Sequence, residues 1–173
     1  MKSPEELTEL FRARGRKVTA QRQCIFRVLQ GDVTHPTAES VYASARAEMP
    51  TMSLKTVYQT LNELAALDEI AALDLGTGTT RFDPNVEGVH HHLVCRSCGK
   101  VRDLHADFSR VSVPPGSDEG FEVGQAEVVF RGLCSECRRR RRDRGGHRAA
   151  RSAVPPGRSG SRVKTEKAEK APA

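Results

Sequence analysis

Four of the five cysteines occur as two closely spaced pairs, Cys95-x2-Cys98 and Cys134-x2-Cys137. Two thiolates separated by two residues can bind one metal ion, and two such pairs make up the tetrahedral four-sulfur set that structural zinc prefers. An iron–sulfur cluster is the alternative that the ligand count leaves open. Because four thiolates leave no free coordination position, we expect this Zn²⁺ to stabilise the fold without taking part in chemistry.

The stretch VHHHLVCRSCG, residues 89–99, places three histidines directly before the first cysteine pair. Side chains alternate between the two faces of an extended strand, so His90 and His92 are expected to face one way and His91 the other. The cysteines complete their own site, which leaves His90 and His92 for a second one, and a pair of imidazoles suits iron, manganese, zinc or nickel. The alternative is a polar, exposed strand edge. Candidates for the remaining ligands of the second site are His35, Asp83 and Asp103.

Residues 4–67 have the apolar periodicity of helices. Thr19, Thr37 and Ser53 stand directly before apolar runs and are candidate N-caps of three of the four expected helices. Cys24 lies among apolar neighbours in the second helix and is expected to be a buried structural thiol. Four apolar residues of the fourth helix recur at helical spacing and are predicted to be its buried stripe: Leu54, Val57, Leu61 and Leu64.

Two short runs on either side of Gly76-Thr77-Gly78 follow the fourth helix and predict a hairpin. Helices followed directly by a hairpin are the order of a winged helix-turn-helix, whose last helix enters the major groove of DNA. The exposed face of that helix carries groups that reach phosphates and base edges: Lys55, Thr56, Tyr58, Gln59 and Asn62. Residues 12–27 contain six basic residues and no acidic one, and add further candidates: Arg16, Lys17, Thr19 and Arg22. The alternative is an ordinary solvated helix face.

The sequence thus predicts an α+β fold with several parts. Residues 1–83 form a winged-helix DNA-binding domain, and residues 84–89 a hinge. Residues 90–137 form a smaller α/β unit from three strand-like runs, HHLVC, KVRDLH and FEVGQAEVVFRG. A unit this small needs a staple, which the Cys₄ zinc site would supply.

The basic charge of the chain belongs to its last part. The net charge is +6, but residues 138–173 hold 13 Lys and Arg against 3 Asp and Glu, so the tail is +10 and the rest −4. With almost no large apolar residue, this tail is predicted to be disordered. The arginine run 138–142 either contacts DNA phosphates or is a solvated tail.

The first residues, MKSPEE, are too polar for a signal peptide, and no apolar run approaches the roughly 18 residues of a spanning helix. We therefore expect a cytoplasmic protein without a membrane partner. Thiols stay reduced there, which favours metal binding over disulfides.

Five motifs, HPTAESVY, SLKTVYQTLNEL, RFDPN, HHHLVCRSCGKVRDLH and AEVVFRGLCSEC, together resemble the ferric uptake regulator (Fur) superfamily over residues 5–137. The resemblance implies a homodimeric, metal-dependent transcription factor that binds a palindromic operator in double-stranded DNA. It also implies that residues 90–137 are the dimerisation domain, with a structural zinc, and that a regulatory metal binds between the two domains.

Within this superfamily, five residues resemble the regulatory ligands of the peroxide-sensing, PerR-type branch: His35, Asp83, His90, His92 and Asp103. Iron sensors typically have Glu at the position of Asp83. The branch implies a repressor of oxidative-stress genes such as catalase, with Fe(II) or Mn(II) as corepressor. Peroxide, its only small-molecule signal, would oxidise His35 and His90 and so release the metal and the DNA. An iron-responsive or a zinc- or manganese-responsive uptake repressor is the alternative.

The sequence departs from the family pattern at several positions. Ala126 stands where iron-uptake regulators have a histidine of a third metal site, and His91 where they often have Asp, so this third site is expected to be absent. Gln59 replaces a frequent Arg on the recognition helix. Residues 105–120 are short and proline-rich where many relatives have a longer helix.

Two other classes of protein are alternatives to a regulator. A metalloenzyme built on the histidines is disfavoured, because the chain has no H-E-x-x-H motif and no general base beside an open three-ligand site. We expect no enzymatic activity. A zinc-ribbon interaction module without a DNA role is the other alternative.

Overall fold

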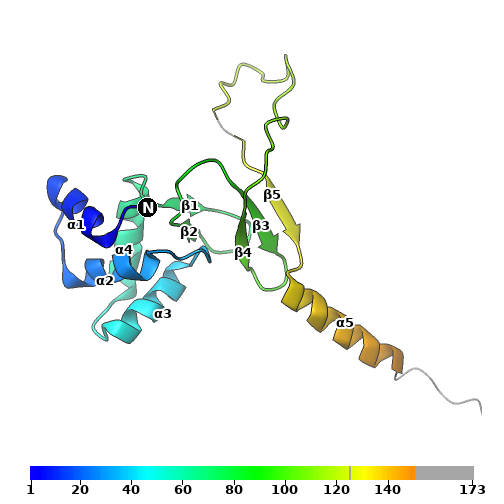
Figure 1. Cartoon of the computed structure of the whole chain (residues 1–173), viewed down its shortest axis with the longest axis horizontal. Helices are drawn as coiled ribbons and strands as arrows, with labels where there is room; N and C mark the ends of the chain where they lie inside the picture. The colour runs from blue at the N-terminus through cyan, green and yellow to red at the C-terminus, as the bar shows by residue number, and fades with distance from the viewer. Residues whose placement is uncertain (125, 151–173) are drawn as a thin grey trace, which may run out of the picture. The chain divides into compact units, whose positions relative to one another are not determined.

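The computed structural model describes residues 1–124 and 126–150, the last six of them by their backbone alone. The chain divides into two units, residues 1–137 and residues 138–173. The first unit begins with four helices, α1 (Pro4–Ala13), α2 (Ala20–Leu29), α3 (Ala38–Glu48) and α4 (Leu54–Ala65) (Figure 1). The strands β1 (Ala71–Leu73) and β2 (Arg81–Asp83) follow, and then β3 (His91–Cys95), β4 (Val101–Leu104) and β5 (Val129–Gly132). The last helix is α5 (Ser135–Ala150).

The predicted helix starts are confirmed by their caps. Thr19, Thr37 and Ser53 precede α2, α3 and α4, and each side chain accepts a hydrogen bond from the backbone N–H three residues further on. Helix α1 starts with a full capping box, in which Ser3 and Glu6 each satisfy the backbone N–H of the other. These caps fix where the helices start and therefore which side chains face the core.

The four helices share one apolar core. Phe11 of α1 meets Phe26 of α2 edge to face, with ring centroids 5.1 Å apart. Cys24 is fully buried, as predicted, and its Sγ lies 3.7 Å from the carbonyl oxygen of Ala45. Burial raises the pKa of this thiol, which keeps it protonated and unreactive.

The prediction for the buried stripe of α4 is wrong at one residue. Val57, Leu61 and Leu64 are buried, but Leu54 is 37% exposed. Leu54 is the first residue of the helix, and side chains there lean toward the N-terminus, beyond the surface that the helix buries. Thr60 lies in the core instead, with its hydroxyl donating to the carbonyl oxygen of Thr56 at 2.8 Å.

The strands form two sheets. Strands β1 and β2 pair antiparallel as the predicted hairpin, and the second sheet has the order β4-β3-β5. In it β4 is antiparallel and β5 parallel to β3. The sequence predicts a strand over residues 121–132, but among the residues of this range that the structure describes, only Val129–Gly132 form one. The ladder ends at the pair His92–Val129, because β3 itself starts only at His91 and offers no longer edge.

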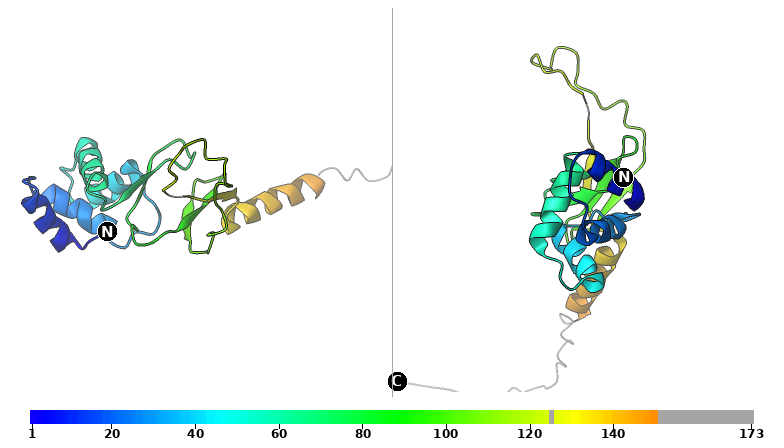
Figure 2. Two further views of the ribbon diagram at one scale, coloured as in Figure 1. Left: turned by 90° about the horizontal axis from the view of Figure 1, so that it is seen from above. Right: turned by 90° about the vertical axis from the view of Figure 1, so that its left-hand side faces the viewer.

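A small second core joins the hairpin to the three-stranded sheet. It consists of Leu75, from the loop after β1, together with Val94 of β3 and Val101 of β4. The hairpin therefore packs against helices through Ile70 and Phe82 and against the second sheet through Leu75. Figure 2 shows the β1–β2 hairpin between α4 and the three-stranded sheet.

Helix α5 differs from the sequence prediction, which has residues 138–173 disordered. The backbone is helical through Ala150, consistent with the high helix propensity of arginine and alanine. The side chains of Arg138–Arg142 are exposed. Residues 151–173 of the predicted tail lie outside the described residues. Within the described part of the chain, no helix is long and apolar enough to cross a membrane.

Candidate metal centres

The two cysteine pairs meet in space. One Sγ atom from each of Cys95, Cys98, Cys134 and Cys137 lies within 4.8 Å of the others, and those of Cys98 and Cys134 are 3.8 Å apart. Cys95 ends β3, whereas Cys134 lies between β5 and α5 and Cys137 lies in the first turn of α5. This Cys₄ centre is the closed set of a structural zinc, and it joins β3 to the chain that follows β5.

Local backbone geometry prepares the sulfurs for a metal. The turn after β3 closes at Gly99, whose φ of +69° favours glycine, and the Gly99 N–H donates to the Cys95 carbonyl oxygen. The Cys134 N–H donates to Cys95 Sγ at 3.3 Å. This N–H, against the effect of desolvation, lowers the pKa of Cys95 to about 6.

Cys98 behaves in the opposite way. The backbone N–H of Lys100 favours its thiolate, but the other three sulfurs outweigh this and raise its pKa to about 11. Without a metal, the group therefore holds protons that zinc must displace.

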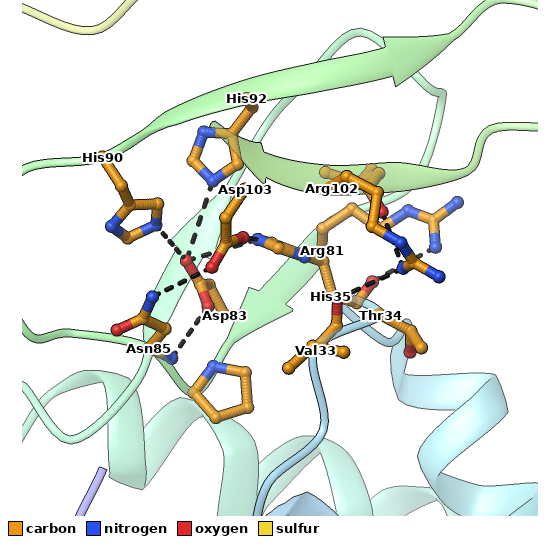
Figure 3. Close-up of polar contacts among 12 residues, drawn as sticks. Val33, Thr34, His35, Arg81, Asp83, Asn85, His90, His92, Arg102 and Asp103 are labelled. Carbon is orange, nitrogen blue, oxygen red and sulfur yellow. Dashed lines mark hydrogen bonds and ion pairs between the residues drawn. The ribbon is translucent and has the colours of Figure 1, made fainter. Parts of the chain in front are cut away.

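The second centre, the His/Asp centre, brings together all five predicted regulatory ligands. One ligand atom from each lies within 4.8 Å of the others: His35, Asp83, His90, His92 and Asp103. In Figure 3 their side chains converge on the Asp83 carboxylate. Asp83 Oδ2 lies 2.8 Å from His90 Nε2, 3.4 Å from His35 Nε2 and 3.7 Å from His92 Nε2. His35 Nε2 is 2.8 Å from Asp103 Oδ1.

The charges in this centre are strongly coupled. Burial disfavours ionisation of Asp83, but hydrogen bonds from His35, the Asn85 N–H and His90 outweigh it and hold its pKa at about 2. Burial likewise disfavours the charged form of His90, yet the Asp83 carboxylate raises the pKa of His90 overall. A metal therefore competes with a proton for the His90 nitrogen.

The donor atoms fit a divalent ion such as Fe(II) or Mn(II). Three of them, His35 Nε2, His92 Nε2 and Asp103 Oδ1, are buried and make no well-aligned hydrogen bond among the described residues, although His35 Nε2 and Asp103 Oδ1 lie 2.8 Å apart. Unsatisfied buried polar atoms are costly, and a bound cation would satisfy all three at once. Imidazole nitrogens with carboxylate oxygens are the ligands that such ions take.

Two residues that sequence reasoning missed support these ligands. Glu127 Oε1 lies 2.9 Å from Nδ1 of His92, which orients the imidazole with Nε2 toward Asp83. Asn85 donates from its backbone to Asp83 Oδ1 at 2.8 Å and from its side chain to Asp103 Oδ2 at 2.9 Å. Neither residue belongs to a spacing motif. The one sequence signal for either residue is that Asn85 ends the RFDPN motif, which also contains the ligand Asp83.

His91 and Ala126, two positions where the sequence departs from the family pattern, lie away from the His/Asp centre. His91 is buried on the opposite side of β3 from His92, stacks edge to face on Phe108 at 4.7 Å, and accepts from the Val128 N–H. Ala126 is exposed.

The candidate DNA-binding residues fall into two groups. Lys17, Lys55 and Asn62 are exposed. The others make contacts within the protein, many of which centre on Glu63 of α4. Its carboxylate pairs with Arg16 at 2.9 Å and Arg22 at 2.6 Å.

The remaining candidates have the following partners. Gln59 also donates to Glu63, at 3.2 Å. The Tyr58 hydroxyl donates to Glu39 at 2.7 Å. Thr56 Oγ1 contacts Ser53 Oγ, and Thr19 caps α2.

Comparison with known proteins places this arrangement in a family. The model of the Ferric uptake regulator family matches residues 13–131. The Peroxide operon regulator of Bacillus subtilis is 32% identical over 142 residues, which cover 77% of this chain and 92% of that protein. The Peroxide-responsive repressor PerR of Staphylococcus epidermidis is 31% identical over 135 residues, 78% of this chain and 89% of that protein.

Among solved structures, a zinc-bound manganese uptake regulator has a TM-score of 0.63 at 26% identity and covers 77% of this chain and 99% of that one. With its two metal centres and the matching helices and strands, the chain belongs to the Ferric uptake regulator family, whose members are metal-responsive transcription regulators rather than enzymes.

Proposed function

We propose that the chain is a peroxide-responsive repressor that binds a palindromic operator as a homodimer when Fe(II) or Mn(II) fills the His/Asp centre. We place it in the cytoplasm, where thiols stay reduced. The observation that carries the proposal is the origin of the ligands. His35 and Asp83 come from the winged-helix domain, and His90, His92 and Asp103 from the second domain, residues 90–137, which contains the three-stranded sheet. An ion bound by both parts stabilises the arrangement in which they are closed.

The DNA-binding surface of this proposal is the exposed face of α4. Lys55, Tyr58, Gln59 and Asn62 lie on it and offer an ammonium, a hydroxyl and amides to phosphates and bases. Lys17, which is exposed, and Arg16, whose side chain is 34% exposed, extend this surface toward α2. Arg22 is mostly buried against Glu63 and contributes by holding this carboxylate in place.

Exposed apolar residues on the second sheet support the homodimer. Leu93 of β3 and its neighbour Phe130 of β5 are 44% and 43% exposed, and Leu133 follows at 38%. A strand face of this kind is stabilised by burial against a symmetric copy. The pairing would set the distance between two α4 helices and hence the spacing of operator half-sites.

Peroxide sensing is supported by the relatives and by Asp83. Fe(II) in the centre would supply the reducing power that activates peroxide next to the imidazoles. In the net reaction, a ring C–H of His35 or His90 gains one oxygen atom and loses two electrons, while hydrogen peroxide is reduced to water. Both side chains lie beside Asp83, at 3.4 and 2.8 Å. An oxidised imidazole binds metal poorly, so the two domains would separate and the DNA would be released.

Mass spectrometry tests the peroxide proposal. We expect peroxide treatment of the Fe(II)-loaded protein to add the mass of one oxygen atom to a peptide that contains His35 or His90. The same peptide from a Mn(II)-loaded control should stay unmodified. An unmodified protein that keeps its DNA affinity after peroxide would instead identify an iron-responsive repressor. A zinc- or manganese-responsive repressor, which the likeness to a manganese uptake regulator favours as the second candidate, would bind the operator with its own metal but not with Fe(II).

DNA binding itself is tested by selection from a random pool of duplexes with added Mn(II). We expect an enriched palindrome whose affinity disappears when a chelator removes the weaker-bound metal. Replacing Lys55, Tyr58 and Gln59 together with Ala should abolish enrichment, whereas Arg110→Ala, an exposed arginine far from α4 in the sequence, should not. Equal binding by the triple variant would show that α4 is not the DNA-binding surface. A wild type that enriches no duplex would point to a zinc-containing interaction module without a DNA role.

A further inference from the structure

The loop that carries His35 is held by its backbone carbonyls. This His35 loop, residues 33–36, precedes α3, and His35 has φ +53°, a conformation that non-glycine residues adopt only where their surroundings impose it. Three of its carbonyl oxygens accept hydrogen bonds from other segments: Val33 from Arg102, His35 from Arg81, and Pro36 from the Phe82 N–H. The position of His35 therefore depends on these donors.

Arg81 makes the most connected of these contacts. One guanidinium nitrogen donates to the His35 carbonyl oxygen at 3.2 Å, and the other donates to the Gly99 carbonyl oxygen at 2.9 Å. Gly99 closes the turn of the first cysteine pair, and Arg81 lies two residues before the ligand Asp83 on β2. Figure 3 shows its side chain between β2 and the His35 loop.

The Arg81 guanidinium is also poorly hydrated. Its Nε atom is buried and has no hydrogen-bond partner among the described residues. A charged group removed from water in this way depends strongly on the bonds that it keeps. Arg102 differs, because it is exposed, its bond to Val33 is 3.3 Å long, and it has no described contact with the cysteine turn.

We propose that Arg81 is a positioning residue that couples the two metal centres. Its guanidinium holds the His35 loop against the turn of the first cysteine pair, so the affinity of the His/Asp centre for a divalent ion depends on the position of the Cys₄ centre. The inference rests on the proposed function only in that an ion binds the His/Asp centre, and it requires neither DNA nor peroxide.

The physical reason for the coupling is the shared bridge. Zinc fixes the Cys95–Gly99 turn, the turn fixes one end of the guanidinium, and the guanidinium fixes the carbonyl group of a metal ligand. If one of these contacts is lost, His35 can relax from its strained backbone conformation. Metal binding must then restore this conformation, and this lowers the affinity for the metal.

The first test replaces Arg81 in the full-length, zinc-containing protein. We expect Arg81→Met to weaken Mn(II) binding, followed by electron paramagnetic resonance of free Mn(II), about 10- to 100-fold. Arg102→Met is the matched control and should stay within about 3-fold of the wild type. Zinc content and far-UV circular dichroism should be the same in all three proteins, which separates positioning from folding.

A second readout needs no added metal. Hydrogen exchange of the peptide that covers residues 32–37 should be faster in Arg81→Met than in Arg102→Met or the wild type, while the exchange of α4 stays unchanged. Unchanged exchange together with unchanged Mn(II) affinity would overturn the proposal.

Coupling to the cysteine turn is tested with Gly99→Ala, which keeps all four cysteines and Arg81. A Cβ there would lie 3.0 Å from the Arg81 guanidinium and would strain the positive φ. We expect Gly99→Ala to weaken Mn(II) binding about 10-fold in the wild type and to have no further effect in Arg81→Met. An equal loss in both backgrounds would show that Arg81 does not transmit the coupling. Should Arg81→Met fail to fold, Gly99→Ala alone carries the test, and wild-type affinity at full zinc content overturns the proposal.

His35→Ala separates this inference from the proposed function. If His35→Ala loses Mn(II) binding but Arg81→Met does not, the regulatory centre stands and the role of Arg81 is wrong. If His35→Ala binds Mn(II) like the wild type, the His/Asp centre itself is wrong, and the proposal falls with it.

Discussion

Asp83 is the carboxylate on which the His/Asp centre is organised. Its Oδ2 lies near three imidazoles, closest to that of His90, and Asn85 fixes its second oxygen. Its low pKa means that the carboxylate is present over the whole physiological pH range. The imidazoles are therefore aligned before any ion arrives, which reduces the reorganisation that metal binding requires.

Glu127 should control the affinity of the same centre through His92. Because its carboxylate accepts the Nδ1–H of His92, it favours the tautomer whose Nε2 lone pair faces the centre. We expect Glu127→Ala to weaken Mn(II) binding about 10-fold. Glu127→Gln should recover most of the loss, because the amide oxygen accepts the same hydrogen bond. Equal weakening by both variants, measured by titration calorimetry, would show that charge matters rather than orientation.

At this scale the sequence predicts ligands far better than their supports. The cysteines stand out by spacing, and His90 and His92 by strand alternation, because these patterns are local. The resemblance to a known family supplied the completed set with His35, Asp83 and Asp103. Nothing local identifies Arg81 or Glu127, whose partners are a backbone carbonyl and a histidine 35 residues away.

Helix α4 has one face in the core and another toward solvent. Val57, Leu61 and Leu64 anchor it among the other helices, and this fixes the orientation of Lys55, Tyr58 and Gln59. The proposed DNA-binding surface therefore depends on the packing of the core.

Two substitutions in α4 measure this anchoring. We expect Leu61→Ala to lower the free energy of unfolding by about 2–5 kcal/mol, because it leaves a cavity in a fully buried site. Leu54→Ala removes the same number of carbon atoms from an exposed site and should change it by no more than about 0.5 kcal/mol. Urea unfolding followed by circular dichroism compares them. A similar loss for both would mean that Leu54 is buried in solution.

Helix α5 should add affinity for DNA without specificity. Its exposed run Arg138–Arg142 presents positive charge at successive positions, and successive positions point to different sides of a helix, which suits contacts with phosphates more than with base edges. Replacing all five with Gln should weaken binding to the selected palindrome and to random duplex by the same factor. The magnitude of the slope of log affinity against log salt should fall by about 0.9 for each phosphate that the Gln variant no longer neutralises. A variant with Lys at all five positions should keep the slope of the wild type. An unchanged slope would identify α5 as a solvated helix.

Elements are predictable where local chemistry decides them. Thr19, Thr37 and Ser53 mark helix starts because a cap needs only its own next residues. The shortening of β5 was not predictable, because the extent of the partner strand β3 decides it. Leu54 is exposed and Thr60 is buried, and the apolar pattern does not predict either. How α4 lies on the core decides which residues near its start are covered.

The first unit, residues 1–137, contains two cores of unequal strength. Fifteen buried residues join the helices and the hairpin, whereas three, Leu75, Val94 and Val101, lie in the second core. The three-stranded sheet therefore depends on zinc, and the helices depend on their own packing.

Removal of zinc tests this division. After chelation, we expect amide hydrogens of β3, β4 and β5 to exchange rapidly, while α2 and α4 keep their protection. Mn(II) affinity at the His/Asp centre should fall in parallel, because His92 and Asp103 lie on two of these strands. Mass spectrometry of the exchanged peptides measures both parts of the chain in one sample. Retained protection of β3 would contradict the structural role of zinc.

The acid residues of the His/Asp centre also determine which valence it accepts. Asp83 and Asp103 bring two negative charges, and the three histidines are neutral when they bind a metal. A doubly charged cation makes the filled centre electrically neutral, so no net charge lies in the low-dielectric interior. A singly or triply charged ion would leave one charge uncompensated there, at a substantial energetic cost. The two aspartates would thus favour doubly charged ions over others. Oxidation of bound Fe(II) to Fe(III) would add one uncompensated positive charge, and this would favour release of the iron.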